Sequence, residues 1–325
     1  MPLRPGEGNH TVLKKRTKYA ATALVTVLAF TATTASSASA RSIINYWPRD
    51  TVYAIAPDYS YVAEWMGLST GWTIIGGPAS HIYGGSAGLF AIDPTTGDIS
   101  EYNGTPGSWT TIGGPGWEFV QSNGHLYGLG VGGGYVAEWN GTPNSWTIIG
   151  GAAGNIYGGG YGLIATSPGT GYTGNVWYYN GTPNSWTDIG SSGDDFAVGT
   201  NAVYRESYDY LTISQWTGGT TWTPISPTNA QGLRIDAAGP EGLFVTDISN
   251  NDEELRYNGT PSSWTEVGNF SVGAYAGAES TTSVYGGTTN HGAGGGIAGV
   301  YLWSGSGENW TQIGGPAAWP LAAEG

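Results

Sequence analysis

Short alternations of apolar and polar residues run along the chain after about residue 50, separated by glycine, asparagine or proline. One stretch shows four of them in succession, at residues 117–123 (WEFVQSN), 125–131 (HLYGLGV), 135–140 (YVAEWN) and 145–150 (SWTIIG). A period of two, with β-branched and aromatic residues, predicts strands joined by tight turns. No stretch after the first forty residues combines a helical period with capping residues. The pattern therefore predicts an all-β fold.

The strands belong to a repeat of seven units. The fourth strand of each unit opens with an anchor tryptophan, and the anchors are Trp72, Trp109, Trp146, Trp186, Trp222, Trp264 and Trp310, at spacings of 37, 37, 40, 36, 42 and 46 residues. The third strands end in another aromatic residue, at Trp65, Tyr102, Trp139, Tyr179, Trp216, Tyr257 and Trp303. Units of this length with four strands each predict a seven-bladed β-propeller of four-stranded antiparallel blades. An open solenoid would need polar capping units, and neither end of the repeat has one.

The two ends of the repeat predict how the ring closes. The last anchor strand is followed by residues 316–325 (PAAWPLAAEG), whereas the first unit begins with what should be its second strand, Thr51–Pro57. We expect residues 318–323 to pair with Thr51–Pro57 as the innermost strand of the first blade. The alternative is that Ser42–Trp47 (SIINYW) fills that position.

The first forty residues have the three parts of a secretory signal peptide. Leu13–Ala20 is basic, Ala21–Phe30 is apolar, and small residues then lead to an A-x-A pattern at Ala38 and Ala40. The alternative is an uncleaved N-terminal anchor, but the apolar run is shorter than the roughly 20 residues that a membrane span needs. We therefore expect residues 1–40 to be a leader, residues 41–325 to be a single propeller domain, and the mature protein to be secreted and extracellular.

The charge of the mature chain restricts its partners. It would keep 23 of the 24 acidic residues but only five of the ten basic ones, all arginine, for a net charge of about −18. Such a surface repels phosphate groups, so neither nucleic acid nor an anionic membrane is an expected partner. The chain has no cysteine, so a secreted form must rely on its core or on ring closure. We expect a monomer.

The phrase NGTPNSWTIIGG (residues 140–151) recurs in near-copies and combines a turn with an anchor strand. Asn-Gly followed by Thr-Pro is typical of a tight loop. Asn-Gly-Thr is also a nominal glycosylation acceptor, but the turn already explains it, and the following proline disfavours its use. An aromatic ring at the same place in every unit is most simply a filler between blades.

The stretch Trp109–Leu129 (WTTIGGPGWEFVQSNGHLYGL), followed by YVAEWNG, resembles the repeat of tachylectin-2 and tectonin-type lectins. That family pairs a Trp-x-x-Ile-Gly-Gly strand with a strand pair ending in Leu-Tyr-Gly and an aromatic-Asn/Lys-Gly turn. The resemblance implies a β-propeller that binds sugars, often N-acetylated, at sites repeated between blades. This chain departs from the family in having seven shorter units, and units five and seven lack the Asn-Gly-Thr-Pro phrase.

Sugars stack on aromatic faces and exchange hydrogen bonds with carboxylates and amides. The candidate ligand-binding residues precede a third-strand aromatic or lie in the repeated turns: Glu64, Glu101, Glu138, Gln215, Asn103, Asn140, Asn180 and Asn258. The alternative is that the acidic side chains form a solvated face and the asparagines only form turns. We expect several weak glycan sites at blade junctions, whose avidity would add.

No other motif predicts chemistry as directly. Among the histidines after the leader, His81, His125 and His291 show no metal-ligand spacing, and residues 250–254 (NNDEE) lack the glycine and spacing of a calcium loop. We expect no metal, no cofactor and no catalysis. The alternatives are a lyase or glycosidase with a site at the central channel, for which Asp194, Asp195 and Asp236 are the acids to check, or a protein-interaction scaffold.

Overall fold

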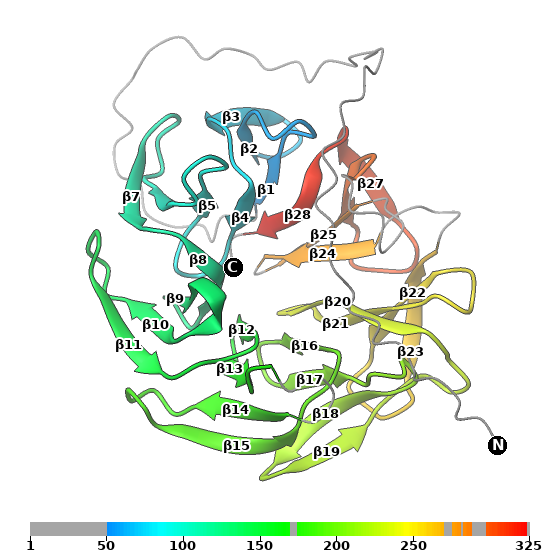
Figure 1. The fold of residues 1–325 in the computed structure, drawn as a ribbon. Coiled ribbons are helices and arrows are strands. Elements are labelled where there is room, and N and C mark those ends of the chain that lie inside the picture. Colours follow the sequence, from blue (N-terminus) through cyan, green and yellow to red (C-terminus); the bar gives the residue numbers. More distant parts are fainter. Residues whose placement is uncertain (1–50, 170–173, 270–274, 281, 288–296, 324–325) are drawn as a thin grey trace, which may run out of the picture.

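The computed structural model describes residues 51–169, 174–269, 275–280, 282–287 and 297–323. These residues form seven four-stranded antiparallel sheets arranged as blades around a central axis (Figure 1). The protein is therefore a seven-bladed β-propeller, as the repeat predicts. In the described part of the chain the only helical element is a single 3-10 turn, η1 (Val131–Gly133).

We number the blades along the chain and give their strands from the innermost outward. Blade 1 contains β28 (Ala318–Ala323), β1 (Val52–Ile55), β2 (Val62–Trp65) and β3 (Trp72–Gly76). Blade 2 contains β4 (His81–Tyr83), β5 (Phe90–Ile92), β6 (Ile99–Tyr102) and β7 (Trp109–Gly113). Blade 3 contains β8 (Gly116–Ser122), β9 (His125–Gly130), β10 (Val136–Trp139) and β11 (Trp146–Gly150).

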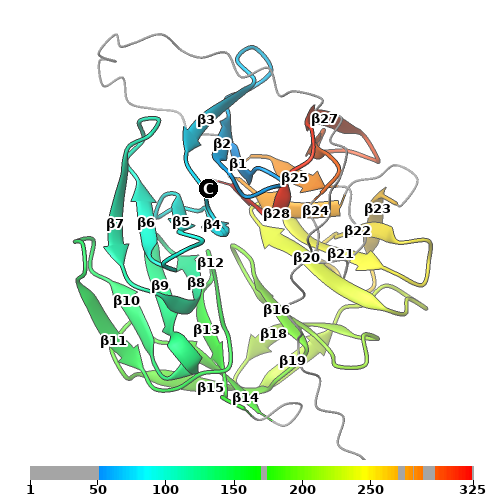
Figure 2. The same cartoon turned by 45° about the horizontal axis from the view of Figure 1, so that its top comes forward.

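The other four blades continue the same order around the ring (Figure 2). Blade 4 contains β12 (Ile156–Gly159), β13 (Gly162–Thr166), β14 (Asn175–Tyr179) and β15 (Trp186–Ser191). Blade 5 contains β16 (Asp195–Val198), β17 (Val203–Glu206), β18 (Ile213–Gly218) and β19 (Thr221–Pro224). Blade 6 contains β20 (Leu233–Gly239), β21 (Gly242–Asp247), β22 (Glu253–Tyr257) and β23 (Trp264–Gly268). Blade 7 contains β24 (Tyr275–Glu279), β25 (Val284–Gly287), β26 (Val300–Trp303) and β27 (Trp310–Gly314).

The ring closes through the C-terminal strand. β28 is antiparallel to β1, with Ala318 opposite Ile55 and Ala323 opposite Val52. Blade 1 is thus built from both ends of the repeat, and the prediction that residues 318–323 complete it is confirmed. The alternative segment, residues 42–47, and the expected leader, residues 1–40, lie outside the described residues.

The core lies between neighbouring blades. Ile149 and Leu129 of blade 3, for example, are fully buried in one cluster with Ile156 and Leu163 of blade 4. One face of each blade therefore covers the facing side of the next. Burial of apolar surface at these junctions is the main force that holds the blades together.

The seven anchor tryptophans join each blade to the one before it. Every anchor indole N–H donates a hydrogen bond to a carbonyl on the outer part of the preceding blade, at N···O distances of 2.6–3.0 Å. In the order of the anchors from Trp72 to Trp310, the acceptors are the carbonyls of Ile313, Ile75, Ile112, Ile149, Ile189, Ile225 and Val267. The bond from Trp72 to Ile313 crosses from blade 1 to blade 7 and so completes the circle.

The glycine that ends most anchor strands lies beneath the next anchor indole. A Cβ atom placed on Gly113 would lie 2.8 Å from Nε1 of Trp146, and Gly76, Gly150 and Gly314 meet their neighbouring indoles in the same way. A side chain here would displace the ring, because the interior has no spare volume. This explains why Gly follows Ile in the recurring Trp-Thr-x-Ile-Gly strand.

The repeated Asn-Gly-Thr-Pro phrase adds a second bond to the same carbonyl. Asn144 has a φ of 60°, and its backbone N–H donates to the Ile112 carbonyl that also accepts from the indole of Trp146, at 2.8 Å and 3.0 Å. Gly107, Asn184 and Ser262 occupy the equivalent position in blades 2, 4 and 6, also with positive φ and the corresponding bond. The phrase thus orders a loop that fastens one blade to the preceding one.

Candidate functional site

Two pockets lie at equivalent blade junctions, each beside an anchor tryptophan. The first, which we call the 3/4 pocket, lies between blades 3 and 4 and has a volume of about 210 Å³. Its lining residues are Val136, Gly150, Gly151, Ala152, Ala153, Ala165, Thr166, Ser167, Pro168, Trp177 and Trp186. Small residues thus form most of the walls, and two indoles are the only large groups among them.

Trp177 distinguishes the 3/4 pocket from the other junctions. It lies on β14, two residues before the third-strand aromatic, where the other blades carry Ala63, Ser100, Ala137, Ser214, Leu255 and Tyr301. Its side chain is 36% exposed, and its indole N–H donates to Oγ of Ser167 at 3.2 Å. The hydrogen bond holds the ring on the rim of the pocket, where one side of the indole can meet a ligand.

Polar groups surround the two indoles. Thr166 Oγ1 accepts a hydrogen bond from the N–H of Asn155 at 3.0 Å, and Ser167 Oγ lies 3.2 Å from the Asn175 carbonyl. Asp188 is opposite Trp177 in the strand register, and its carboxylate accepts a 2.7 Å hydrogen bond from the Asn175 side chain. Directly opposed residues share a face of the sheet, so a carboxylate and an amide lie beside the indole.

The second pocket, which we call the 5/6 pocket, lies between blades 5 and 6 and has a volume of about 530 Å³. It is lined by Pro227, Thr228, Asn229, Ala230, Asp247, Ser249, Asn250, Glu253, Leu255, Ser262 and Trp264. Trp264 is the anchor of blade 6 and corresponds to Trp186 in the 3/4 pocket. The two pockets thus share an architecture, but the second has carboxylates and amides in place of small residues.

A third polar region is the channel mouth, where four inner strands begin. His81, Glu118, Asp195 and Arg234 occupy equivalent register positions at the starts of β4, β8, β16 and β20. The inner strands run in the same direction around the ring, so these residues lie at one end of the central axis. The repeated unit therefore places a different side chain in each blade at a shared level.

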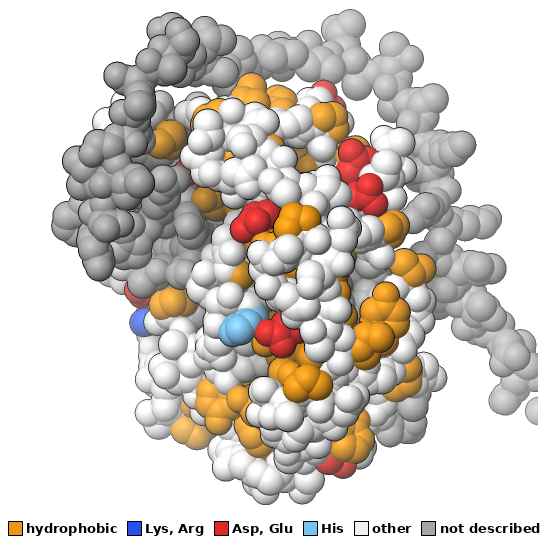
Figure 3. Space-filling view, turned by 90° about the vertical axis from the view of Figure 1, so that its left-hand side faces the viewer, with side chains coloured by type: hydrophobic (Ala, Val, Ile, Leu, Met, Phe, Trp, Pro, Cys, Tyr) orange, Lys and Arg blue, Asp and Glu red, His pale blue; other side chains and the backbone are white. Residues whose placement is uncertain are grey.

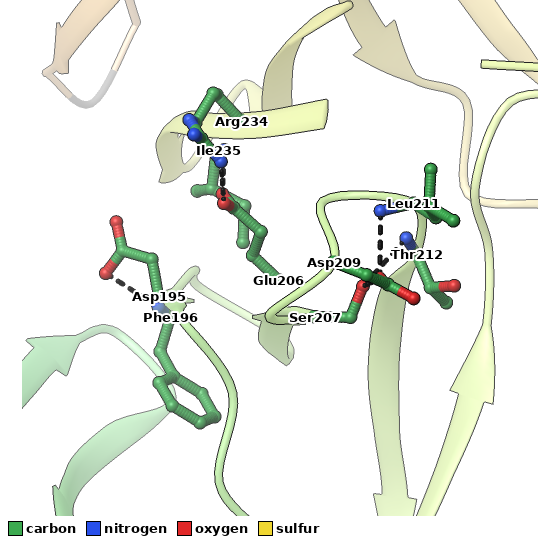
Figure 4. A network of polar contacts seen from close by, with 9 residues as sticks. All are labelled: Asp195, Phe196, Glu206, Ser207, Asp209, Leu211, Thr212, Arg234 and Ile235. Atoms are coloured by element: carbon green, nitrogen blue, oxygen red, sulfur yellow. Dashed lines mark hydrogen bonds and ion pairs between the residues drawn. The ribbon is translucent and has the colours of Figure 1, made fainter. Parts of the chain in front are cut away.

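Carboxylates at the channel mouth bind the edges of inner strands (Figure 4). Glu118 of blade 3 accepts from the N–H of Ile156 in blade 4 at 3.0 Å, and Glu206 of blade 5 accepts from the N–H of Ile235 in blade 6 at 2.8 Å. Asp195 accepts from the N–H of Phe196 at 2.8 Å. These N–H groups lie on the unpaired edge of an inner strand, which would otherwise lack a partner.

Glu206 is the most enclosed of these acids. Its side chain is buried, and Arg234 Nη1 approaches its Oε1 to 2.8 Å. The guanidinium carbon of Arg234 in turn lies 3.4 Å from the ring centre of Tyr210, on the β17–β18 loop. The ion pair and the cation–π contact together join blades 5 and 6 at the channel mouth.

Burial raises the pKa values of several acidic groups at the channel mouth. It raises the pKa of Glu118 to about 7, although the hydrogen bond from Ile156 acts in the opposite direction. It also raises the pKa of Glu206 to about 7, although the N–H of Ile235 and the charge of Arg234 lower it. Burial likewise raises the pKa of Asp195 and that of the Tyr157 phenol. Removal from water favours the neutral form of each acid.

Beside these acids, the backbone of β12 lies very close to the neighbouring inner strands β8 and β16. A Cβ atom on Gly158 would overlap the Gln121 carbonyl of blade 3, and one on Gly159 would overlap the Val198 carbonyl of blade 5. Ser122 Oγ donates to the Gly159 carbonyl at 2.9 Å. β12 therefore packs closely between β8 and β16, and only glycine at positions 158 and 159 permits this approach.

The predicted glutamate and glutamine candidates occupy one equivalent position in four different blades. Glu64, Glu101, Glu138 and Gln215 lie opposite a threonine of the anchor strand, and the structure does not bring them together. Glu64 is buried, and burial raises the pKa of Glu101. Glu138 lies 2.7 Å from Nδ1 of His125.

The predicted asparagine candidates close their own turns. In blades 3, 4 and 6, Asn140, Asn180 and Asn258 each donate from Nδ2 to the serine five residues on and accept at Oδ1 from the threonine seven residues on, at 3.0–3.2 Å. Asn103 does the same in blade 2, with Ser108 and Thr110. Their amides thus hold the loop together by hydrogen bonds. Neither the four asparagines nor the four glutamate and glutamine candidates line either pocket.

The acids named for a channel enzyme come from blades 5 and 6. Asp194 and Asp236 both act electrostatically on Asp195 and help to raise its pKa. Asp236 accepts a 2.7 Å hydrogen bond from Thr246. The structure therefore groups the three acids at the channel mouth, and it adds Glu118 and Glu206, which the sequence did not single out.

The described residues hold no group of three or more acidic or histidine side chains suited to a metal ion. No helix in the same residues has the length and apolar character needed to cross a membrane. On the side formed by blades 2 and 3, hydrophobic side chains form small separate patches among polar and backbone atoms, with few charged groups (Figure 3).

No family model matches the chain, and no curated protein matches it. Among solved structures, the acylaminoacyl peptidase of Pyrococcus horikoshii is similar, with a TM-score of 0.57 and 10% identity over 81% of this chain and 50% of the peptidase. YCF48 from Cyanidioschyzon merolae gives 0.48 and 10%, over 74% of this chain and 94% of YCF48. The GH74 enzyme of Niastella koreensis gives 0.45 and 16%, over 78% of this chain and 41% of the enzyme. The chain spans about half of the peptidase's length, and at this identity the similarity shows the propeller fold alone.

Proposed function

We propose that the protein is a carbohydrate-binding propeller that binds sugars non-covalently at its blade junctions, with the 3/4 pocket as the principal site. The observation that carries the proposal is the pair of indoles, Trp177 and Trp186, in a pocket edged by hydroxyl groups. A sugar ring has an apolar face that stacks on an indole and hydroxyls that need hydrogen-bond partners.

The chemistry of the walls favours a neutral sugar. Thr166 and Ser167 can donate or accept, and no residue of the lining is charged, although the Asp188 carboxylate lies beside Trp177 outside the lining, where it accepts from Asn175. Small residues such as Gly151 and Ala153 leave room for one ring or its N-acetyl group. The pocket is small, at about 210 Å³, so we expect a single site to bind weakly, with a Kd of the order of millimolar.

The seven-fold repeat offers related junctions for further weak contacts. Each junction has an anchor indole, but the residue equivalent to Trp177 differs from blade to blade. A glycan with several exposed branches would gain avidity where more than one junction binds. The proposal includes secretion, which the pattern of residues 1–40 favours, and membership of the tectonin-type lectins, which the resemblance of residues 109–129 favours.

The test is a glycan array with the protein from Arg41 onward, followed by calorimetric titration of the sugars that bind. We expect Trp177→Ala to weaken binding by about tenfold or more, because it removes both the apolar area that the sugar covers and a stacking contribution of about 0.5–1.5 kcal/mol. Trp177→Phe should keep part of the affinity, because it retains an aromatic face.

The matched control is Trp117→Ala. Trp117 is 65% exposed on β8 and does not line either pocket, so its loss removes an exposed indole elsewhere. Binding to the Trp117→Ala protein should equal that of the wild type. Absence of binding to every sugar tested, or equal loss in the two variants, would refute the proposal.

A further inference from the structure

The 5/6 pocket has the same position as the 3/4 pocket but a different lining. Trp264 lines it in the place of Trp186, while Leu255 replaces Trp177. Its volume of about 530 Å³ exceeds that of the 3/4 pocket, at about 210 Å³. The larger pocket can hold a whole sugar ring and part of a second one.

Two carboxylates lie on the walls of the 5/6 pocket. Asp247 is only 4% exposed, and its Oδ1 accepts hydrogen bonds from the N–H and hydroxyl of Ser249 at 3.0 Å and 2.7 Å. The Asp247 side chain lines the pocket. A carboxylate has lone pairs for several donors, so Asp247 can accept a further hydrogen bond from a ligand in the pocket.

Glu253 supplies the second carboxylate. Asn250 Nδ2 donates to its Oε2 at 2.6 Å, which fixes the side chain at the pocket edge. Asp247 and Glu253 are also directly opposed in the register of β21 and β22, so they share a face of the sheet. Two like charges held together in a partly enclosed space attract a cation.

The described lining contains no lysine or arginine that would neutralise these acids. A carboxylate accepts hydrogen bonds but cannot donate them, so the pair favours a ligand that carries several donors and a positive charge. Thr228, Asn229 and Ser249 add neutral groups suited to sugar hydroxyls. The indole of Trp264 adds a flat apolar surface to the lining.

We propose that the 5/6 pocket is a separate site for an amino sugar in its protonated form, with the ammonium group held by Asp247 and Glu253 and the ring against Trp264. The site does not depend on sugar binding at the 3/4 pocket, because the two pockets have no lining residue in common. N-acetylation removes the charge and all but one of the donor hydrogens of the nitrogen. The pocket should therefore distinguish glucosamine units from N-acetylglucosamine units.

The test is calorimetric titration of the protein with a glucosamine trimer and, separately, with the N-acetylglucosamine trimer, at low ionic strength. We expect the glucosamine trimer to bind to the 5/6 pocket at least about tenfold more tightly than its acetylated counterpart does, because charge-assisted hydrogen bonds are roughly twice as strong as neutral ones. The affinity for the glucosamine trimer should fall as salt is added, because added ions screen charge pairs near the surface.

The double variant Asp247→Asn with Glu253→Gln should lower the affinity for the glucosamine trimer by about tenfold or more. Both substitutions keep the oxygen that accepts from Ser249 or Asn250, so the loops should stay folded, which thermal unfolding can verify. Asp98→Asn, which removes a carboxylate between β5 and β6 of blade 2, is the matched control and should bind as the wild type does.

Three outcomes would overturn the proposal. One is equal affinity for the two trimers, and another is unchanged affinity in a folded double variant. The third is equal binding of a linear diamine, which would show that charge alone, without a ring on Trp264, accounts for the interaction. Failure of neutral sugars to bind, with the glucosamine trimer still bound, would refute only the 3/4 pocket.

Discussion

The outer seam of the propeller, formed by the seven anchor tryptophans and their acceptor carbonyls, differs from the junction pockets in how far its residues repeat from blade to blade. Along the outer seam, all seven junctions have an anchor indole bonded to a carbonyl of the preceding blade. In the pockets, the residues that face the space differ from one junction to the next, as Trp177 and Leu255 do. Positions that are the same in every unit therefore support the ring, and positions that vary are free to meet ligands.

The largest effect should come from breaking the outer seam. Trp146→Ala removes an indole that contacts Phe119 and bonds to the Ile112 carbonyl. We expect the free energy of unfolding to fall by about 3–5 kcal/mol, as for other large-to-small changes of enclosed aromatic residues. Chemical denaturation followed by tryptophan fluorescence or circular dichroism measures this change.

Trp117→Ala is the matched comparison for Trp146→Ala, because the Trp117 side chain is mostly exposed. Its free energy of unfolding should stay within about 0.5 kcal/mol of the wild type. If both variants lose the same stability, the outer seam is not what holds the blades together.

A smaller effect should follow from filling the space beneath an anchor ring. In Gly113→Ala the new Cβ would lie 2.8 Å from Nε1 of Trp146. We expect a loss of about 1–3 kcal/mol, because the indole must shift away from its carbonyl partner. Gly77→Ala is the control, since nothing lies within 4 Å of its added methyl group. Equal stability of the two variants in denaturant titrations would contradict the close packing described here.

The channel mouth should make stability depend on pH. Burial raises the pKa of Glu118 from 4.5 to about 7, so the folded protein holds this proton more tightly than the unfolded chain does. The contribution of Glu118 to the free energy of unfolding is therefore greatest below pH 4.5, falls as pH rises from 4.5 to 7, and is constant above that range. Glu206, whose pKa is also raised to about 7, acts in the same direction.

Glu118→Gln isolates this effect, because the amide oxygen can still accept from Ile156 but cannot titrate. At pH 7.5 the variant should be more stable than the wild type by about 1–2 kcal/mol, and the two should converge near pH 4.5. Denaturant titrations at both pH values measure the difference, with Asp98→Asn as the control for removal of a carboxylate. A variant that is less stable than the wild type at pH 7.5 would show that ionised Glu118 supports the ring.

The smallest effect concerns the loop that carries Asn144. Its φ of 60° is unfavourable for most side chains but is tolerated by Asn and Gly. Asn144→Ala should reduce stability by about 1 kcal/mol, whereas Asn144→Gly should change it by a few tenths at most. Thermal unfolding of the two variants is sufficient. A more harmful change to Gly than to Ala would mean that the loop conformation is not the reason for this residue.

The fold could be predicted from the sequence because its signals are local and repeated. Each anchor tryptophan follows a turn at a fixed distance, and seven such units can bury their sheets only against one another. The closing strand was also predictable. The first unit has no inner strand before Thr51–Pro57, and residues 318–323 follow the last complete unit. The ring that the sequence predicts is the ring that the structure shows.

The candidate site was harder to predict, because it depends on which side chains meet across a junction. Asn140 and its equivalents suit sugar recognition by residue type, but the structure shows that their amides close a turn. The sequence does not mark Trp177 as a site residue, because it stands beside repeated aromatics in the run VWYY. A comparison of units at that position would have marked it, since the other blades have an aromatic residue there only at Tyr301.

The acids of the channel mouth show the same limit. Glu118 and Glu206 lie on different strands of different blades, 88 residues apart in the sequence. Their similar roles depend on the N–H groups of Ile156 and Ile235, which become neighbours only when the ring forms. Sequence spacing carries no information on that juxtaposition.

The central claim is that repeated tryptophans hold the ring and that a non-repeated one binds ligand. Measuring both the free energy of unfolding and the sugar affinity of the Trp177→Ala protein tests it most directly. The account predicts a stability within about 1 kcal/mol of the wild type, together with a loss of binding of about tenfold or more. A variant that unfolds as readily as Trp146→Ala while binding sugar as the wild type does would contradict it.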